Sequence, residues 1–218
     1  MLAVIGAFAG RRGNTLPLLR RVMVESTRPP DEFWVVCEER ADARAAWQAV
    51  YDLFKETPDP VRVVELPTPR TGNRYDIIPY SNKINFALDN SDADMFVYLD
   101  NGSMPHPEKY ELMSRELERN PDMDMVYCAQ RRTGYRVESH DPGIPLDSGF
   151  CVLNFTQVMH RPVQARWTLD MQYADPDLAD ALFWQAIRAE FGTQFFPVSH
   201  GKVLDEHDMP SPAAQGLT

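Results

Sequence analysis

Cysteine is scarce in this sequence, and long apolar runs are absent. The three cysteines, Cys37, Cys128 and Cys151, lie far apart in apolar segments and form no CxxC motif. This excludes a disulfide framework and favours reduced, buried thiols. The first apolar run is followed by Arg11, is too short to cross a bilayer and lacks a basic leader. We therefore expect a cytoplasmic protein without a membrane span.

An excess of positive charge is also missing. The 218 residues include 22 Lys and Arg against 32 Asp and Glu, a formal net charge of -10. This balance argues against a nucleic-acid partner and against a polybasic membrane-surface protein. With 44% hydrophobic and 25% charged residues, the composition is that of a globular domain and excludes wholesale disorder.

Three common catalytic or nucleotide-binding motifs are absent. No GxGxxG follows the first apolar segment, and neither GxxxxGK[ST] nor GxSxG occurs. Dinucleotide-binding, P-loop and nucleophile-elbow interpretations therefore lose their main support.

What is present is an alternation of strand-like and helix-like segments. Apolar runs of strand length alternate with amphipathic segments, which predicts parallel β-α units in a doubly wound sheet. The predicted strands of the first half are Leu2–Ala9, Phe33–Cys37, Val61–Leu66 and Met95–Leu99. In the second half we expect strands at Met123–Ala129, Phe150–Phe155 and Gln194–Val198, helices at 107–119 and Leu178–Phe191, and a loop at 131–145.

Polar residues at the carboxyl ends of these strands are the candidate ligand contacts, because open parallel sheets bind ligands there. Asp100 follows Met95–Leu99 in the sequence Asp-Asn-Gly-Ser. A carboxylate at this position can hold a ribose hydroxyl or a divalent ion, although the same four residues also favour a simple turn. The same rule predicts that a nucleotide lies across the first, second and fourth strands, touching Ala7, Phe8, Ala9, Arg11, Glu38 and Asp100.

Further segments fall in a characteristic order. They are Phe33–Glu39 with its paired acids, Thr71-Gly72-Asn73, Asn85-x-Ala87-Leu88, Asp100-Asn101-Gly102 with Pro105, Asp147-Ser148-Gly149, Asp177-Leu178-Ala179-Asp180 and His207. This order and spacing resemble the nucleotide-sugar glycosyltransferases of the GT-A fold, especially the family 2-like group. The resemblance covers roughly residues 2–208 and rests on no single motif.

The resemblance implies one α/β domain with a Rossmann-like, mostly parallel sheet. Residues 1–208 would form it, with a nucleotide-binding half at 1–103 and an acceptor half at 104–208, followed by a flexible tail at 209–218.

The resemblance also implies roles for individual residues. Those expected to bind the nucleotide donor are Glu38, Asn73, Lys83, Asp100 and Asn101, and those expected near the acceptor or donor sugar are Asp147, Ser148, Gly149 and Trp167. Asp180, or else Asp177, would be the catalytic base, although their spacing also suits helix capping.

One departure concerns a metal ion. The family's D-x-D signature has its second Asp replaced by Gly102. Either Asp100 holds Mn²⁺ or Mg²⁺ with help from His207, or metal dependence is weak, or the site is degenerate.

The expected activity is transfer of a sugar from a nucleoside-diphosphate sugar to a hydroxyl of a glycan, protein or small molecule, with inversion. One alternative is a sugar nucleotidyltransferase, because Gly10-Arg11-Arg12-Gly13 is a fragment of the glycine- and arginine-rich loop of such enzymes. The other is a degenerate nucleotide-sugar-binding module, because of Gly102.

Overall fold

The computed structural model describes most of the chain. The described residues are 1–8, 15–55, 59–67, 78–100, 102–133, 154–169, 176–191, 196–197 and 203–208. No helix within these ranges is both long and apolar enough to span a membrane.

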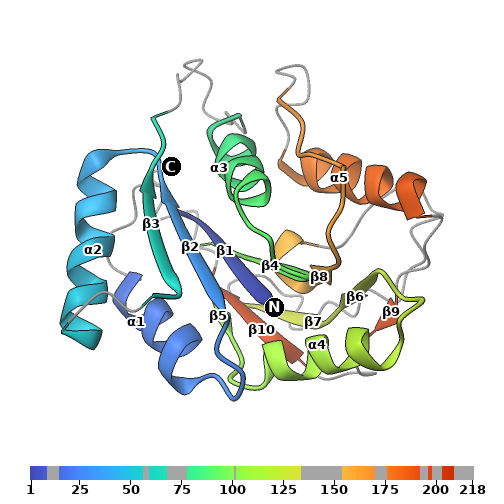
Figure 1. Cartoon of the computed structure of the whole chain (residues 1–218), viewed down its shortest axis with the longest axis horizontal. Coiled ribbons are helices and arrows are strands. Elements are labelled where there is room, and N and C mark those ends of the chain that lie inside the picture. Colours follow the sequence, from blue (N-terminus) through green and yellow to red (C-terminus); the bar gives the residue numbers. More distant parts are fainter. Residues whose placement is uncertain are drawn as a thin grey trace.

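A seven-stranded sheet runs through the centre of the molecule in the order β3-β2-β1-β4-β8-β6-β9 (Figure 1). Four neighbouring strands are parallel: β1 (Leu2–Phe8), β2 (Glu32–Cys37), β3 (Val61–Glu65) and β4 (Met95–Leu99). Every residue of β2 and β4 is buried, which explains why these strands are apolar along their whole length. Their carboxyl ends lie along one edge.

The remaining strands of this sheet come from the second half of the chain. They are β8 (Val158–His160), β6 (Met125–Tyr127) and β9 (Phe196–Pro197). β8 is antiparallel to both β4 and β6, and β9 is parallel to β6. The sheet is therefore mixed but mostly parallel, as the sequence predicts.

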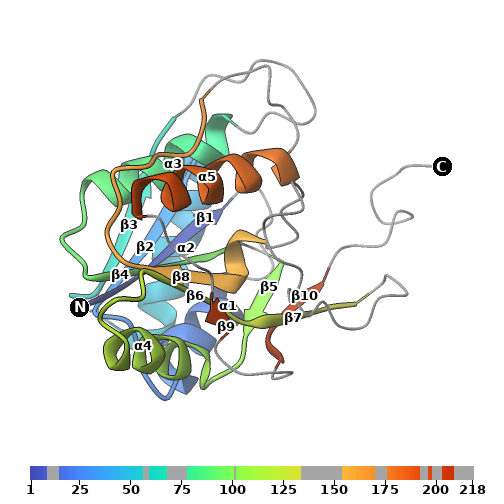
Figure 2. The ribbon, with the colours of Figure 1, turned by 90° about the vertical axis from the view of Figure 1, so that its right-hand side faces the viewer.

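Helices cover both faces of the sheet (Figures 1 and 2). One face carries α1 (Thr15–Arg20), the π-helical turn η1 (Arg21–Glu25), α2 (Arg40–Phe54) and α4 (Lys109–Arg119). The other face carries α3 (Ile78–Asp89) and α5 (Pro176–Phe191). Two separate apolar cores result, one on each side of the sheet, as expected for a doubly wound fold.

A second, three-stranded sheet has the order β5-β10-β7. Its strands are β5 (Ser103–Pro105), β10 (Val203–Asp208) and β7 (Ala129–Thr133). β10 is antiparallel to β5 and parallel to β7. Because β5 begins three residues after Asp100, this small sheet adjoins the carboxyl end of β4.

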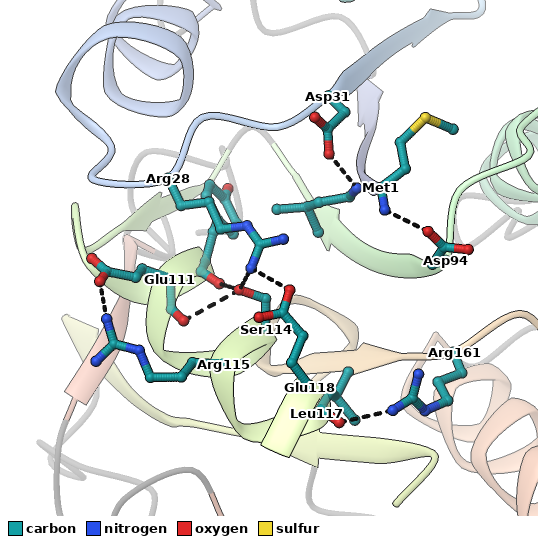
Figure 3. Close-up of polar contacts among 12 residues, drawn as sticks. Met1, Arg28, Asp31, Asp94, Glu111, Ser114, Arg115, Leu117, Glu118 and Arg161 are labelled. Carbon is teal, nitrogen blue, oxygen red and sulfur yellow. Dashed lines mark hydrogen bonds and ion pairs between the residues drawn. The ribbon is translucent and has the colours of Figure 1, made fainter. Parts of the chain in front are cut away.

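Polar contacts fasten the edge of the sheet opposite the strand ends (Figure 3). The N-terminal ammonium group contacts Asp94 at 2.5 Å, and the N–H of Leu2 donates to Asp31 at 2.7 Å. Arg28 donates to Ser114 and Glu118 of α4. These contacts join α4 and the start of β1 to the rest of the sheet. They lie at the edge opposite the carboxyl ends of the parallel strands.

Three sequence predictions of secondary structure are wrong. Phe155 does not end a strand but begins a 3-10 turn, η3 (Phe155–Gln157), and the strand follows it as β8; residues 150–153 lie outside the described ranges. The predicted strand Met123–Ala129 is two strands in different sheets, β6 and β7. β7 runs to Thr133, into the predicted loop, because β10 pairs with it.

Candidate functional site

Asp100 lies directly after β4, at the edge where the parallel strands end. Its Oδ1 accepts a hydrogen bond from the backbone N–H of Gly102 at 2.8 Å, and its carbonyl accepts from the N–H of Ser103 at 3.3 Å. Asp100 therefore closes a tight turn. The same turn holds its half-buried carboxylate at the carboxyl edge of the parallel strands, the edge at which sheets of this kind bind ligands.

Asp180 lies in the first half of α5 and is 8% exposed. Its Oδ2 accepts a hydrogen bond from the backbone N–H of Phe155 at 3.1 Å, in the first position of η3. One oxygen of the predicted catalytic base is thus oriented by a backbone donor from a different element.

Tyr80, in the first turn of α3, has a hydroxyl whose pKa is affected by the charges of both acids. Its hydroxyl oxygen is buried and has no hydrogen-bond partner among the described residues. Burial, followed by the negative charges of Asp180 and Asp100, raises the pKa of Tyr80 well above its ordinary value. The charges of both carboxylates thus contribute to the raised pKa of this one hydroxyl.

Aromatic rings hold Tyr80 in place. Its ring meets Phe155 edge-on at 5.0 Å between centroids and Trp167 at 5.8 Å. Trp167 is 1% exposed and stacks on Phe183 at 4.7 Å. Asn85 fixes the backbone of Trp167 with two hydrogen bonds, of 2.9 and 2.8 Å. Trp167 is a core residue within this group of aromatic rings, and its contact with a sugar stays a prediction.

An acid directly follows β2, and a buried lysine of α3 lies near the end of the same strand. Glu38 is half-buried and directly follows the strand. Lys83 of α3 is 1% exposed, and its positive charge opposes the rise in the pKa of Cys37, which burial and then Asp42 bring to about 11. Lys83 therefore lies near the last residue of β2 and adds positive potential there.

The backbone of His207 lies beside the Asp100 turn. On β10 it pairs with Ser103 of β5, three residues after Asp100. The structure thus places the strand of one predicted metal ligand beside the turn of the other. No group of three or more His, Cys, Asp or Glu side chains close enough to bind a metal occurs within the described ranges, and the metal site stays a prediction.

The other predicted residues divide into two groups. Ala7 and Phe8 end β1, where Phe8 pairs with Cys37, and Asp177 lies in the first turn of α5. The predictions that fall outside the described ranges are Ala9, Arg11, Asn73, Asn101, Asp147, Ser148 and Gly149.

Solved structures with the same arrangement include those of S. aureus TarS, a GT-A-type glycosyltransferase. TarS 1–349 matches with a TM-score of 0.68 over 95% of this chain and 60% of that one, at 14% identity. Its complex with UDP-GlcNAc also gives 0.68, over 96% and 59%, at 13% identity. The fold is GT-A-like. A mycobacterial protein matches it with a TM-score of 0.59 over 95% of this chain and 65% of that one, at 15% identity.

Sequence comparison adds one curated relative of this GT-A-like chain. Protein CgeD of Bacillus subtilis (strain 168) is 30% identical over an alignment 142 residues long, which covers 58% of this chain and 32% of CgeD. The chain therefore spans about a third of CgeD and 60% of the TarS fragment. No protein-family model matches the sequence.

Proposed function

We propose that this chain is a glycosyltransferase that moves a sugar from a nucleoside diphosphate to an acceptor hydroxyl, with inversion at the anomeric carbon. The observation that carries the proposal is a GT-A-like sheet with Asp100 at its carboxyl edge and Asp180 oriented by the Phe155 N–H. The charges of both acids contribute to the raised pKa of the buried Tyr80 hydroxyl. TarS structures with UDP and with UDP-GlcNAc support a nucleotide sugar as the donor.

The donor end of the site is the edge formed by β2 and β4. Glu38 and Asp100 supply carboxylates for hydroxyl groups of the ribose, and Lys83 supplies positive potential toward the phosphates. The hard oxygen ligands of Asp100 suit Mg²⁺ or Mn²⁺, which bind nucleotides with few protein ligands. When bound, such an ion would neutralise charge on the diphosphate, with Asp100 and His207 as the residues that hold it.

Asp180 is the proposed general base. The acceptor hydroxyl attacks the anomeric carbon, its proton passes to the carboxylate of Asp180, and the bond from carbon to the diphosphate oxygen breaks. The hydrogen bond from the Phe155 N–H holds one oxygen of Asp180 and so fixes the direction of the carboxylate. A single displacement of this kind inverts the configuration of the sugar.

Tyr80 is the proposed hydrogen-bond donor between the two acids. The pKa of Tyr80 lies even further above neutral pH than that of an ordinary tyrosine, so the hydroxyl is protonated and has a proton to donate. A buried hydroxyl without a partner is costly, and an oxygen of the bound donor would satisfy it.

The test is binding followed by turnover. Nucleoside diphosphates and their sugars, beginning with UDP and UDP-GlcNAc, are screened by thermal shift with and without Mn²⁺, and donors that bind are assayed for release of the diphosphate. A transferase raises its melting temperature and slowly releases nucleoside diphosphate. Release of pyrophosphate from a nucleoside triphosphate and a sugar phosphate would identify a nucleotidyltransferase instead, and binding without release would identify a binding module.

A further inference from the structure

The turn that orients Asp180 is itself held by a buried polar cluster. We name Lys109, Gln130, Thr156 and Asp205 the Thr156 cluster. The Lys109 ammonium donates to the Thr156 carbonyl at 2.6 Å and lies 3.4 Å from Oδ1 of Asp205. The Thr156 hydroxyl lies 2.7 Å from Oδ2 of Asp205 and 2.8 Å from Oδ1 of Asn154. Gln130 donates both to that hydroxyl and to Oδ2 of Asp205, at 2.9 Å each.

The cluster is shut off from water. Lys109, Gln130 and Thr156 are fully buried, and Asp205 is 1% exposed. A buried ion pair gains little net stability over apolar residues of the same size, because desolvation of the charges offsets their attraction. Its consequence here is geometric: Thr156, the middle residue of η3, is bonded through both its side chain and its carbonyl.

Two members of the Thr156 cluster are connected through the backbone to predicted site residues. Thr156 directly follows Phe155, whose N–H holds Asp180. Asp205 belongs to β10, the strand that carries His207 beside Ser103. The Thr156 cluster therefore links η3 to β10, the strand that adjoins the Asp100 turn, in addition to the capping contacts between Asn154 and Gln157.

We propose that Thr156 is a positioning residue: its hydroxyl, held by Gln130 and Asp205, fixes η3 so that the Phe155 N–H keeps the carboxylate of Asp180 aimed at the acceptor. This inference rests on the proposed role of Asp180 as base. Thr156 itself touches no substrate, and its effect on turnover passes through Phe155.

The variant that tests it is Thr156→Val, which removes the hydroxyl and keeps the size and branching of the side chain. Thr156→Ser restores a hydroxyl. The matched control is Ser114→Ala: the Ser114 hydroxyl is equally buried, accepts from Arg28 (Figure 3) and donates to the Tyr110 carbonyl, but it lies on α4, across the sheet from α3 and α5.

Two measurements separate positioning from simple stability. In Thr156→Val we expect the Phe155 amide to exchange with solvent about tenfold faster, relative to global unfolding, than in the wild type. We also expect kcat to fall about 10- to 100-fold with little change in KM for the donor, because the base is misdirected while the donor site is intact. Thr156→Ser should return kcat to within about threefold, and Ser114→Ala should change only the melting temperature.

Wild-type kcat and a protected Phe155 amide in Thr156→Val would overturn the inference. So would equal losses of kcat per folded molecule in Thr156→Val and Ser114→Ala. If the wild type turns over no nucleotide sugar, the proposed function fails. The exchange of the Phe155 amide and the pKa of the Asp180 carboxyl, both followed by NMR, would still show whether Thr156 fixes that carboxylate.

Discussion

Replacement of Asp180 by asparagine separates a catalytic role from a structural one. Asparagine keeps the shape of the side chain and an oxygen that accepts from the Phe155 N–H, which donates to Asp180 at 3.1 Å. It cannot take a proton from an acceptor hydroxyl. We expect turnover to fall by about 100-fold or more, the loss typical of a missing general base, while the donor still binds.

The effect on stability should be small. A hydrogen bond to a carboxylate is worth about 1 kcal/mol more than one to a neutral amide. For a chain of this length we expect the melting temperature to drop by less than about 4 °C. Turnover and stability are thus predicted to change by very different amounts.

The control is Glu190→Gln on the same helix. Glu190 also accepts backbone hydrogen bonds, from the N–H groups of Gln164 at 2.8 Å and Ala165 at 2.9 Å, but it is exposed and lies ten residues beyond Asp180. Initial rates of nucleoside diphosphate release and thermal unfolding are measured on both variants. If Asp180→Asn lowers the melting temperature yet turns over normally per folded molecule, Asp180 has only a structural role as the acceptor for the Phe155 N–H, and another base must be sought.

Three further predictions follow from the same contacts. Asp100→Ala should abolish the dependence of nucleotide affinity on Mn²⁺, measured by calorimetry; equal wild-type affinity in Mn²⁺ and in chelator would refute the metal proposal. Tyr80→Phe should leave the free protein at least as stable as the wild type, because it removes a buried hydroxyl without a partner, but weaken binding of a nucleotide sugar by about 3- to 10-fold. Tyr110→Phe also removes a buried unpartnered hydroxyl and should leave binding unchanged. Burial lowers the pKa of His160 from 6.5 to about 4, so the unfolded state binds a proton first as pH falls, and stability should decrease by about 3 kcal/mol between pH 7 and pH 4. The free energy of unfolding, measured by chemical denaturation at several pH values, should fall less steeply between pH 7 and pH 4 in His160→Gln than in the wild type.

The pH prediction has a simple structural origin. His160 is fully buried beside β4, with Nε2 2.5 Å from the Tyr98 hydroxyl and Nδ1 2.6 Å from the Arg161 carbonyl. A neutral ring accepts from the hydroxyl at Nε2 and donates to the carbonyl at Nδ1. Protonation would place a second donor against that hydroxyl and a charge in an aromatic core, which is why it favours unfolding.

The parallel half of the fold could be predicted because its signal is local. β2 and β4 are buried on both faces, and such strands must be apolar throughout, so they stand out in the sequence. β5 and β10 could not be found in this way. They are short or acidic, and they form strands because each pairs with a distant segment, Asp205 opposite Pro105 and His207 opposite Ser103.

In the candidate site too, the features with a local sequence signal could be predicted, and those that depend on long-range contacts could not. Asp100 follows from strand burial alone, because an acid directly after an apolar strand must lie at the sheet edge. The structure also places Asp180 against Phe155, a contact across 25 residues whose donor is a backbone N–H present at almost every position of the chain. Side-chain chemistry can be read from a sequence, but a backbone donor becomes specific only when the fold aims it. Tyr80 was not predicted as a site residue for a related reason. Its spacing with Ile84 suggests a core position, and what distinguishes its hydroxyl is the effect of two acids on its pKa, which depends on the fold.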